Sequence, residues 1–488
     1  MTAESIAQKL WNLCNVLRDD GVTYHQYLNE LTYILFLKLS EVKGFSQEIP
    51  AEYRWPQFVN ETDNTKAFNL YRDFLANVST NKNTTSQNIK TIYTNASTSL
   101  RKPVNFNSLV QAIDKLDWYE ESDRDMMGDI YESLLEKNAT EKKSGAGQYF
   151  TPRPLINVMV KLSVPKVGER WNDPAAGTFG FMISADHYLK EKTDDYYKLN
   201  ERERDFQKRE AFSGVELVPD AHRLALMNAR LHGMESTIEM GDTLSSLGEG
   251  LKNFDGVLAN PPFGTKKGGE HPSRKDFTIT TSNKQLNFLH HIYRSLKRDG
   301  NARAAVVLPD NVLFEDNEGR RIRQDLMNKC NLHTILRLPT GIFYAAGVKT
   351  NVLFFSRGRS EVNNTDKVWF YDMRTNMPAY GKRTPFTEEA FQDFIYAYTG
   401  GISADKVVED FNGTIDHKKR ALIKDERWQC ITRKTIAEKN DSLDLGLIAD
   451  SSLQDSATLG EPEEIIREAK DELTAILSQL DLMLKELK

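Results

Sequence analysis

Cysteine is scarce in this chain, and long apolar runs and an excess of positive charge are missing from it. The three cysteines, Cys14, Cys330 and Cys430, lie far apart among 488 residues, so they form neither a disulfide framework nor a zinc-binding set. No apolar run approaches the length of a membrane span, and the amino terminus is amphipathic rather than signal-like. These absences favour a cytoplasmic protein of a reducing compartment, with no structural metal and no membrane contact.

The charge balance limits how the chain can meet nucleic acid. Its formal net charge is -6, which argues against a protein that coats DNA by charge alone. Apolar residues make up 39% of the chain and charged residues 27%, as in ordinary globular proteins. Any DNA contact must therefore be local or shared with a partner.

Periodicity divides the chain into three parts. Apolar residues recur at helical spacing over residues 1–140, for example in "YLNELTYILFLKLSEV", which predicts an all-helical amino-terminal domain. Over residues 141–400 short apolar strands alternate with helices, which predicts an α/β domain with a mostly parallel sheet. Residues 401–488 are expected to end in a helix that begins after Pro462. The expected strands lie in GERWNDPA, EAFSGVEL, FDGVLANPP, ARAAVVLP, HTILRLP, TNVLFFSRG and KVWFYDM.

Acidic residues close three successive strands. Asp173, in "NDPAAGTFGF", is followed by Gly177 and Gly180, which allow a sharp turn and a close approach of the backbone to a ligand. Glu216, in "SGVEL", stands where an acidic side chain accepts hydrogen bonds from ribose hydroxyls, and Asp242, in "MGDTL", follows the next turn. The first loop lacks the G-x-G-x-x-G pattern, and a tight turn without a ligand explains it equally well. Three carboxylates at three strand ends favour a ligand.

The next strand, "FDGVLA", runs directly into Asn260, Pro261, Pro262 and Phe263. Paired prolines fix the backbone of this loop, whereas an ordinary strand-ending turn does not require them. Because the loop follows three acidic strand ends, we interpret it as part of a reactive site.

These segments resemble a known family. In order, "DPAAGTFGF", "GVEL", "GDTL" and "NPPFG" resemble the motifs of S-adenosylmethionine-dependent amino-methyltransferases, and "GAGQYFTPRPLI" resembles their amino-terminal cofactor motif. The whole chain, through "LPDNVLF" and "GVKTNVLFFSRG" to the last helix, resembles the modification subunit of type I restriction-modification systems. The resemblance implies a Rossmann-like methyltransferase domain between a helical domain and a helical tail. It also implies methylation of adenine N6 in duplex DNA, at sites chosen by a separate specificity subunit.

The same resemblance implies S-adenosylmethionine as the cofactor, and no metal. Ala176 and Phe179 depart from the commonest spelling of the first motif, where many relatives carry a small thiol residue and a further glycine, but both glycines of the motif are intact. The residues implied to bind the cofactor are Gln148, Tyr149, Phe150, Thr151, Pro152, Asp173, Ala175, Gly177, Thr178, Gly180, Glu216 and Asp242.

Methylation of an adenine amino group gives the Asn-Pro-Pro-Phe loop a chemical purpose. The lone pair of this nitrogen is delocalised into the ring, so the nitrogen must become more tetrahedral as it attacks the sulfonium methyl. We expect the amide oxygen of Asn260 and the carbonyl of Pro261 to accept its two N–H bonds, with Pro262 holding that carbonyl in place. Phe263 would stack on a base that has left the duplex. Attack is in line, so the reaction needs neither a metal nor a covalent enzyme intermediate.

Other features carry weaker signals. A basic loop of Lys266, Lys267, Arg274 and Lys275 follows the Asn-Pro-Pro-Phe loop and is placed to contact phosphates, although charge runs are usually just solvated.

Three residues that also attract notice have ordinary explanations. Phe343 is a candidate for a second aromatic wall of the base pocket, but an apolar residue at a strand end more often belongs to the core. His290 and His291 lack acidic or cysteine partners at ligand spacing, so we expect structural roles for both.

The last segment, "EPEEIIREAKDELTAILSQLDLMLKELK", predicts a partner-binding helix. Its apolar residues alternate three and four apart, and flanking leucines widen the stripe to suit a bundle of three or four helices. Folding back on its own chain is the alternative. In the family that the chain resembles, the partner would be the specificity subunit, with two modification subunits on one specificity subunit and a restriction/translocase subunit in the full complex.

Rival functions remain within and outside the enzyme class. A protein-glutamine or RNA amino-methyltransferase faces the same lone-pair problem, but those relatives usually carry Tyr in place of Phe263 and lack the large helical domain. A scaffold without activity would be free to lose Asn260, Glu216 and Asp242. A solitary methyltransferase that reads its own DNA site needs a long target-recognition region, and the residues after Arg374 look too few and too helical for one.

Overall fold

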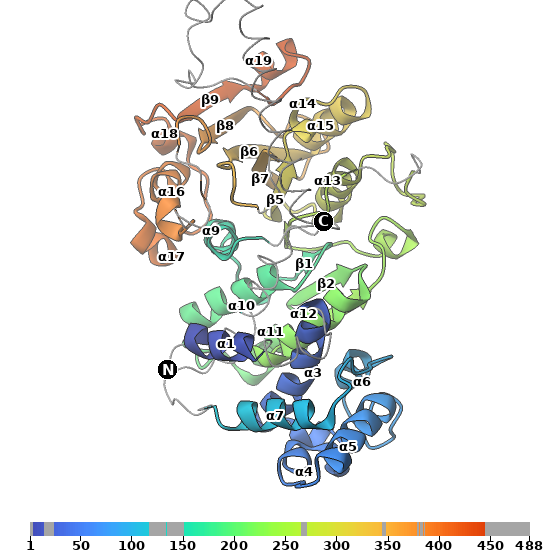
Figure 1. The fold of residues 1–488 in the computed structure, drawn as a ribbon. Coiled ribbons are helices and arrows are strands. Elements are labelled where there is room, and N and C mark those ends of the chain that lie inside the picture. The colour runs from blue at the N-terminus through green and yellow to red at the C-terminus, as the bar shows by residue number, and fades with distance from the viewer. Residues whose placement is uncertain are drawn as a thin grey trace, which may run out of the picture.

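The computed structural model describes residues 3–13, 24–116, 133, 151–264, 271–343, 348–377, 380, 384 and 386–444. The helical segments form one end of the molecule and an α/β body forms the other (Figure 1). None of the helices in these ranges is long and apolar enough to cross a membrane. The helix predicted after Pro462 and the residues Gln148, Tyr149 and Phe150 lie outside the described part of the chain.

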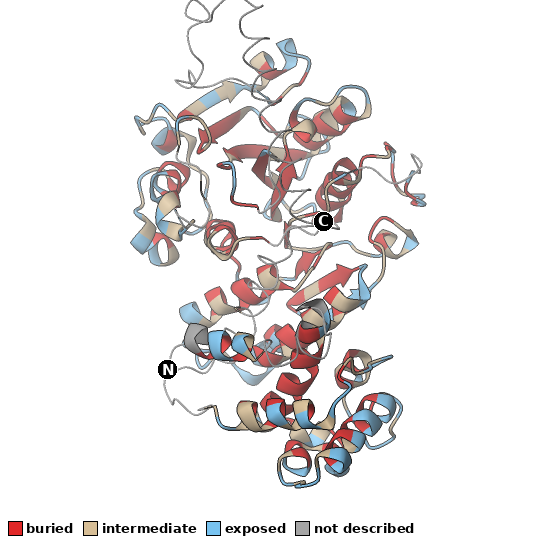
Figure 2. Ribbon diagram, viewed as in Figure 1, coloured by how far each residue is buried: buried red, intermediate tan, exposed pale blue. Residues whose placement is uncertain are grey.

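Helices alone make up the described regular structure before residue 117. The long helix α3 is buried on nearly all sides because the neighbouring helices pack around it, and its buried stretch includes polar side chains such as Glu30 and Thr32. Its neighbours are instead buried on one side and exposed on the other (Figure 2). The predicted helical region before the α/β part is therefore confirmed. The helices are α1 (Ala3–Asn12), α3 (Tyr24–Val42), α4 (Trp55–Val59), α5 (Asn64–Asn77), α6 (Gln87–Ile92) and α7 (Pro103–Asp114).

The α/β body is organised by one mixed sheet with the strand order β3-β2-β1-β4-β5-β7-β6-β8-β9. Strands β1 to β5 are mutually parallel, β7 runs antiparallel to both β5 and β6, and β9 runs antiparallel to β8. All seven segments expected to form strands do so. The strands are β1 (Trp171–Asp173), β2 (Phe212–Glu216), β3 (Thr237–Met240), β4 (Gly256–Ala259), β5 (Arg303–Pro309), β6 (Cys330–Arg337), β7 (Thr350–Arg357), β8 (Lys367–Asp372) and β9 (Trp428–Thr432).

Both faces of the central strands are covered by helices. Along β4 and β5 alternate residues enter two separate cores: Leu258 and Ala305 pack in the larger core, whereas Val257 and Val306 pack in the smaller one. Helices α9, α10 and α12 contribute to the larger core, and α13 and α15 to the smaller. Burial on both faces explains why these strands are apolar without alternation. The helices are α9 (Arg153–Ser163), α10 (Gly180–Thr193), α11 (Glu201–Arg209), α12 (Pro219–Leu231), α13 (Lys284–Ser295), α14 (Asn311–Phe314) and α15 (Glu318–Lys329).

The segment after residue 386 packs on the same body. Strand β9 extends the sheet by pairing with β8, and Trp428 stacks on Trp369 with ring centroids 4.9 Å apart. Residues on both sides of position 400, among them Tyr398 and Val407, pack in the same core. Sequence reasoning missed β9 because only its first residue is buried, which leaves little apolar signal. The helices here are α16 (Gln392–Thr399), α17 (Val407–Asp410), α18 (His417–Arg420) and α19 (Arg433–Glu438).

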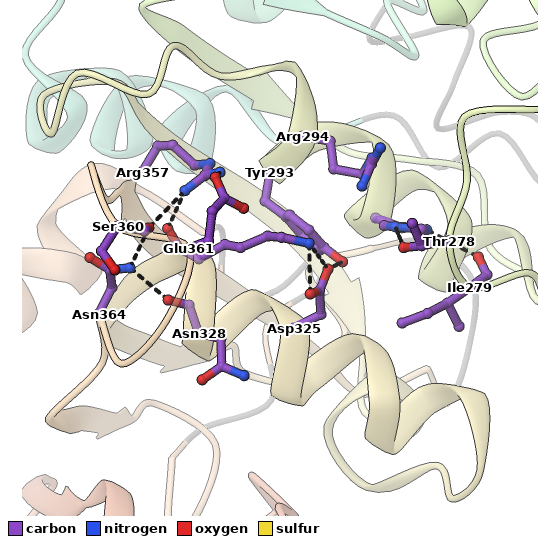
Figure 3. Close-up of polar contacts among 12 residues, drawn as sticks. Thr278, Ile279, Tyr293, Arg294, Asp325, Asn328, Arg357, Ser360, Glu361 and Asn364 are labelled. Carbon is purple, nitrogen blue, oxygen red and sulfur yellow. Dashed lines mark hydrogen bonds and ion pairs between the residues drawn. The ribbon is translucent and has the colours of Figure 1, made fainter.

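Polar contacts hold α13 and α15 together at one edge of the sheet (Figure 3). Tyr293 donates to Asp325 at 2.7 Å, and Asn364 donates to the carbonyl of Asn328 at 2.6 Å. Arg357, which ends β7, lies beside them and pairs with Glu361. Because β7 is antiparallel to β5, this edge carries the amino ends of the parallel strands. The cluster therefore lies opposite the edge where the acidic strand ends meet.

Helix α12 joins the helical part to the sheet. Arg223 donates to the carbonyl of Ile92 at 2.8 Å, and Arg230 pairs with Glu48. Only two residues separate Glu216, the last residue of β2, from the start of α12. The helical part therefore contacts the helix that directly follows the acidic end of β2.

Candidate active site

The carboxyl ends of the parallel strands bring the predicted site residues to one edge of the sheet. Strand β1 lies between β2 and β4. The strands that follow β1 are therefore added first on one side of it (β2, β3) and then on the other (β4, β5). Ligands of open α/β sheets bind at such a switch point. Asp173 ends β1, Glu216 ends β2 and Asp242 follows β3, while Asn260 follows β4. Residues predicted from four separate segments thus lie along one edge.

The loop after β1 is fastened to the end of β2. The carboxylate of Asp173 accepts the N–H of Ala175 at 3.0 Å, and that of Glu216 accepts the N–H of Gly177 at 2.8 Å. Gly177 adopts a left-handed conformation with φ of 53°, which suits glycine because it has no Cβ. Thr178 is held as well, since its carbonyl accepts from Asn228 at 2.9 Å.

The conformation and burial of Phe179 explain why a phenylalanine can stand where many relatives carry glycine. Its φ of 70° lies in the left-handed region, where a residue with a Cβ loses about 1–2 kcal/mol, so a glycine in many relatives is understandable. The phenylalanine ring is fully buried, and burial of an aromatic ring outweighs a strain of that size. Gly214 on β2 leaves the room for this ring, because a Cβ there would lie 3.0 Å from the ring carbon Cε2.

The carboxylate of Glu216 accepts from the backbone N–H groups of Gly177 and Val218, and Met240 lies opposite it on β3. The bond from Val218 measures 2.8 Å, while the carbonyl of Glu216 accepts the N–H of Gly241 at 2.9 Å. Leu217 and Met240 are 61% and 59% exposed beside it. Sequence reasoning did not single out Leu217 or Met240 as exposed apolar residues beside Glu216. The position of Leu217 directly after Glu216 could have drawn attention to it. Asp242 accepts the N–H of Leu244 at 2.8 Å.

The two inner carboxyl groups are hard to ionise. Burial and the neighbouring Glu216 raise the pKa of Asp173 to about 8, opposed only by the N–H of Ala175. Burial also raises the pKa of Glu216, against the N–H groups of Val218 and Gly177. Two adjoining buried carboxyl groups with raised pKa values suit a ligand that brings positive charge and hydroxyl donors.

The Asn-Pro-Pro-Phe loop is held at both ends. Asn260 donates from its amide nitrogen to the hydroxyl oxygen of Thr151 at 2.9 Å. At the other end the N–H of Gly264 donates to the amide oxygen of Gln285 at 3.0 Å, in the first turn of α13. Phe263 is partly buried against the larger core. The structure thus brings Thr151, from the segment before α9, beside the loop after β4.

The remaining predicted cofactor residues lie around these two loops. Pro152 is the N-cap of α9, and Gly180 is the first residue of α10. A Cβ on Gly180 would lie 3.3 Å from the Ile156 side chain, so glycine permits the close approach of α9 and α10 here. Ala175 packs against the small cluster formed around Leu244.

The phosphate contact predicted for Arg274 is wrong. Arg274 is 7% exposed, and its guanidinium donates to the carboxylate of Asp276 at 2.8 and 2.6 Å and to the carbonyl of Thr243 at 2.9 Å. It therefore fastens this loop to the segment after β3. Lys275 is exposed, and residues 265–270, which hold the two other lysines, lie outside the described part.

Phe343 and the histidines belong to the cores. Phe343 is 3% exposed and packs in the larger core, as the more common of the two interpretations predicted. Burial lowers the pKa of His290 to about 4 and that of His291 to about 3, so both rings are neutral at physiological pH. Among the described residues no group of histidine, cysteine and acidic side chains is arranged to hold a metal.

Sequence reasoning assigned no role to "LPDNVLF", and the structure supplies one. Asp310, directly after β5, accepts two hydrogen bonds from Arg374 at 2.7 and 3.0 Å and one from Asn351 at 2.7 Å. These residues tie the ends of β5, β7 and β8 together at the edge that carries Asn260. Their partners lie far apart in sequence, so no local pattern could have paired them.

A doubly covered sheet whose strand order reverses between β1 and β4 defines a Rossmann-like protein, and the comparisons identify the family to which it belongs. Residues 122–412 match the family model for N-6 DNA methylase. The chain is 44% identical to the EcoKI methylase subunit of Escherichia coli (strain K12), covering 100% of this chain and 96% of that protein. It is 43% identical to the StySPI methylase subunit of Salmonella potsdam over the same shares.

Solved structures agree with the sequence matches. The crystal structure of the EcoKI M protein aligns with a TM-score of 0.56 at 39% identity, over 99% of this chain and 96% of that one. A modification subunit of a putative type I restriction enzyme from Vibrio vulnificus YJ016 aligns with a TM-score of 0.69 at 25% identity, over 88% and 93%. The chain therefore belongs to the N-6 DNA methylase family as a methylase subunit of type I restriction enzymes, and it is an N6-adenine DNA methyltransferase.

Proposed function

We propose that this methyltransferase uses S-adenosylmethionine, held by the loops after β1, β2 and β3, to methylate a flipped-out adenine in duplex DNA at the Asn-Pro-Pro-Phe loop. The observation that carries the proposal is that Asp173, Glu216 and Asn260, chosen from separate motifs, lie at neighbouring strand ends of one sheet edge. The cofactor would supply an electrophilic methyl group.

The residues present fit such a cofactor. Asp173 and Glu216 are adjoining buried carboxyl groups, which suit a molecule that carries both positive charge and ribose hydroxyls. Leu217 and Met240 offer exposed apolar surface beside Glu216, which suits the flat face of an adenine ring. Asp242 would accept from the edge of that ring.

The loop after β4 would bind the target adenine and orient its amino group. The amide oxygen of Asn260 and the carbonyl of Pro261 accept the two N–H bonds of the amino group, and Phe263 stacks on the base. Stacking returns about 1–3 kcal/mol, which offsets much of the cost of flipping the base. After the methyl has been transferred, the methylated nitrogen would lose its extra proton to solvent water.

The sequence specificity is proposed to come from a separate specificity subunit, since the elements that the structure describes between β8 and residue 444 are all short. Two methylase subunits would bind one specificity subunit, and a restriction/translocase subunit would complete the assembly. The test maps methylated adenines in DNA from cells with and without this chain, after co-purification of its partners. Adenines methylated at one sequence only when the chain is present are expected; an unchanged map would contradict the proposal.

Gly214→Ala is expected to weaken cofactor binding by about tenfold. Its Cβ would lie 2.9 Å from the Cβ of Ala176 and 3.0 Å from the ring of Phe179, so the loop after β1 must shift. Gly250→Ala is the matched control, because its Cβ meets nothing closer than 3.6 Å. Calorimetric titration with S-adenosylmethionine compares the three proteins, and equal affinities would mean that the loop does not hold the cofactor.

Cofactor affinity is expected to rise with pH and to level off above about pH 8. In the folded protein Asp173 stays protonated up to a pKa of about 8, and a positively charged ligand beside it favours the carboxylate, so binding releases a proton below that pH. The stability of the cofactor-free protein changes with pH in the opposite direction from cofactor affinity. In the unfolded chain Asp173 ionises near its ordinary pKa of about 3.9, so between that pH and about 8 the folded protein holds a proton that the unfolded chain has lost. The contribution of Asp173 to the free energy of unfolding therefore falls as the pH rises from about 3.9 to about 8.

The proton release can be measured directly. Calorimetric titration in two buffers with different ionisation enthalpies gives the number of protons released, and Asp173→Asn should reduce this release and the pH dependence near pH 8 by the contribution of Asp173. A pH-independent affinity in the unaltered protein would mean that Asp173 does not face the charged part of the cofactor.

A further inference from the structure

Arg274 is a buried cation whose partners come from three segments of the chain. Its side chain is 2% exposed, and its Nε and Nη2 donate to the carboxylate of Asp276 at 2.8 and 2.6 Å. Its Nη1 donates to the carbonyl oxygen of Thr243 at 2.9 Å and to Nδ1 of His291, on α13, at 3.0 Å. A guanidinium only donates and a carbonyl only accepts, so the direction of the bond to Thr243 is fixed. Because a buried ion pair adds little net stability, the arrangement that it fixes is the better guide to its role.

Thr243 connects this arginine to two of the loops that are proposed to hold the cofactor. It lies directly after Asp242, in the loop after β3, and is 2% exposed. Its hydroxyl donates to the carbonyl of Pro174 at 2.6 Å, and Pro174 lies directly before Ala175, in the loop after β1. Two hydrogen bonds in series therefore run from Arg274 through Thr243 to the loop after β1.

Apolar contacts join the same segments. Leu244, from the loop after β3, packs with Phe277 and with Phe288 of α13, and Ala175 packs against this small cluster. The guanidinium of Arg274 lies 4.3 Å from the centroid of the Phe277 ring. Because the polar and the apolar contacts connect the same segments, the spacing of the loops after β1 and β3 depends on the segment that carries Arg274.

Gly248 leaves the room that the bond between Arg274 and Thr243 needs. A Cβ at this position would lie 1.9 Å from the carbonyl oxygen of Thr243 and 2.4 Å from Nη1 of Arg274. Any side chain here would therefore force the two groups apart. The sequence thus keeps both the donor and the space through which the donor reaches its acceptor.

We propose that Arg274 is a positioning residue for the cofactor, which acts through Thr243 to hold the loops after β1 and β3 at the spacing that S-adenosylmethionine requires. The proposal rests on the proposed function, because it concerns the same loops. Without the guanidinium, the buried carbonyl of Thr243 loses its donor, and the loop that carries Asp242 is released from the loop that carries Ala175. Arg274 thus affects cofactor binding without touching the cofactor.

Arg274→Lys tests this role because lysine keeps a positive charge beside Asp276, whereas a single ammonium lacks the planar fork that reaches all three partners. We expect calorimetric titration of the full chain, without DNA, to show a rise of about tenfold in the dissociation constant of S-adenosylmethionine. At saturating cofactor, kcat of the complex with the specificity subunit should stay within about threefold, because the change does not alter Asn260. A cofactor affinity equal to that of the unaltered protein would overturn the proposal.

Arg357→Lys is the matched control. The side chain of Arg357 is also 2% exposed, and it pairs with the carboxylate of Glu361 and donates to the carbonyls of Lys329 and Gly358 at 2.6 and 3.1 Å. It lies at the opposite edge of the sheet, so this variant should bind S-adenosylmethionine as the unaltered protein does. An equal loss of cofactor affinity in both lysine variants would mean that any buried arginine of the body has this effect. Thermal unfolding of each variant verifies that it is folded.

Gly248→Ala interrupts the same bond without changing either partner. Its Cβ would occupy the space between Arg274 and Thr243, so we expect it to raise the dissociation constant of S-adenosylmethionine by about tenfold as well. Gly250→Ala, whose Cβ meets nothing closer than 3.6 Å, should leave the affinity unchanged. An unchanged affinity in Gly248→Ala would contradict a role for this bond.

A double variant provides a test that a merely structural role would not pass. Thr243→Val keeps the shape of threonine and removes only the hydroxyl that reaches Pro174. If Arg274 acts through Thr243, breaking either link has the same consequence, so the double variant with Arg274→Lys should bind S-adenosylmethionine within about threefold of the weaker single variant. Losses of affinity that multiply would overturn the proposal. Failure of the unaltered chain to bind S-adenosylmethionine would instead contradict the proposed function.

Discussion

Asn260→Ala is expected to abolish methyl transfer, with a loss of at least about 10³-fold in kcat, while the affinity for S-adenosylmethionine stays within about threefold. The amide oxygen is proposed to act only on the target amino group, so its removal leaves the nucleophile planar and unreactive. The cofactor loops contact other strand ends, since Glu216 binds the N–H groups of Gly177 and Val218. Calorimetry and single-turnover methylation separate the two effects.

Glu216→Ala should show the opposite pattern. Its carboxylate organises the loop after β1, so its loss should weaken cofactor binding by about 10-fold to 100-fold, and saturating cofactor should recover part of the rate. Asn69→Ala, at an exposed position of α5, controls for the loss of an amide and should change neither quantity. Equal losses of cofactor affinity in Asn260→Ala and Glu216→Ala would contradict this division of roles.

The sheet could be predicted because its strands carry local signals. Segments such as "ARAAVVLP" are apolar and short, and β5 is buried on both faces. Strand β9 carries a weak signal because only its first residue is buried, at the end of the sheet. The antiparallel place of β7 between β5 and β6 depends on pairing across the sheet, which no single segment encodes.

The site could be predicted as far as its motifs reach. Asp173, Glu216 and Asn260 were chosen as strand-end residues, and the parallel strands do bring them to one edge. The contact between Thr151 and Asn260 could not be predicted, because 109 positions separate the two residues. The burial of Arg274 was also missed, since a basic run in sequence does not reveal that Asp276 and Thr243 enclose one of its members.

Ending the chain at Gly460 is expected to abolish assembly with the specificity subunit, and with it DNA methylation, while leaving a folded monomer that binds S-adenosylmethionine. The last described residues, which end at Asp444, are held to the α/β body before Gly460 is reached. Asp441 pairs with Arg433 at 2.8 Å and accepts from Gln324 at 2.6 Å, and the N–H of Leu443 donates to the carbonyl of Leu313 at 2.8 Å. Removal of residues 461–488 leaves these contacts in place.

The apolar stripe of the last segment gives the reason for the loss of assembly. A single helix of that length with one wide apolar stripe is marginal in water, so it needs other helices to pack on. The polar stretch before it, "NDSLDLGLIADSSLQDSATLG", has the composition of a tether, which favours an external partner over the same chain. We expect the helical spacers of the specificity subunit to be that partner.

Point variants separate the stripe from the length of the chain. Leu473→Glu and Leu480→Glu place a charge within the stripe and should prevent assembly, because an unpaired charge in an apolar helix interface is strongly unfavourable. Ser478→Glu places the same charge at an outward position of the expected helix and should assemble normally. Light scattering of the mixed subunits measures the mass of the complex. An unchanged two-to-one complex from the chain that ends at Gly460 would mean that the stripe packs on its own chain, and assembly would then have to depend on the body itself.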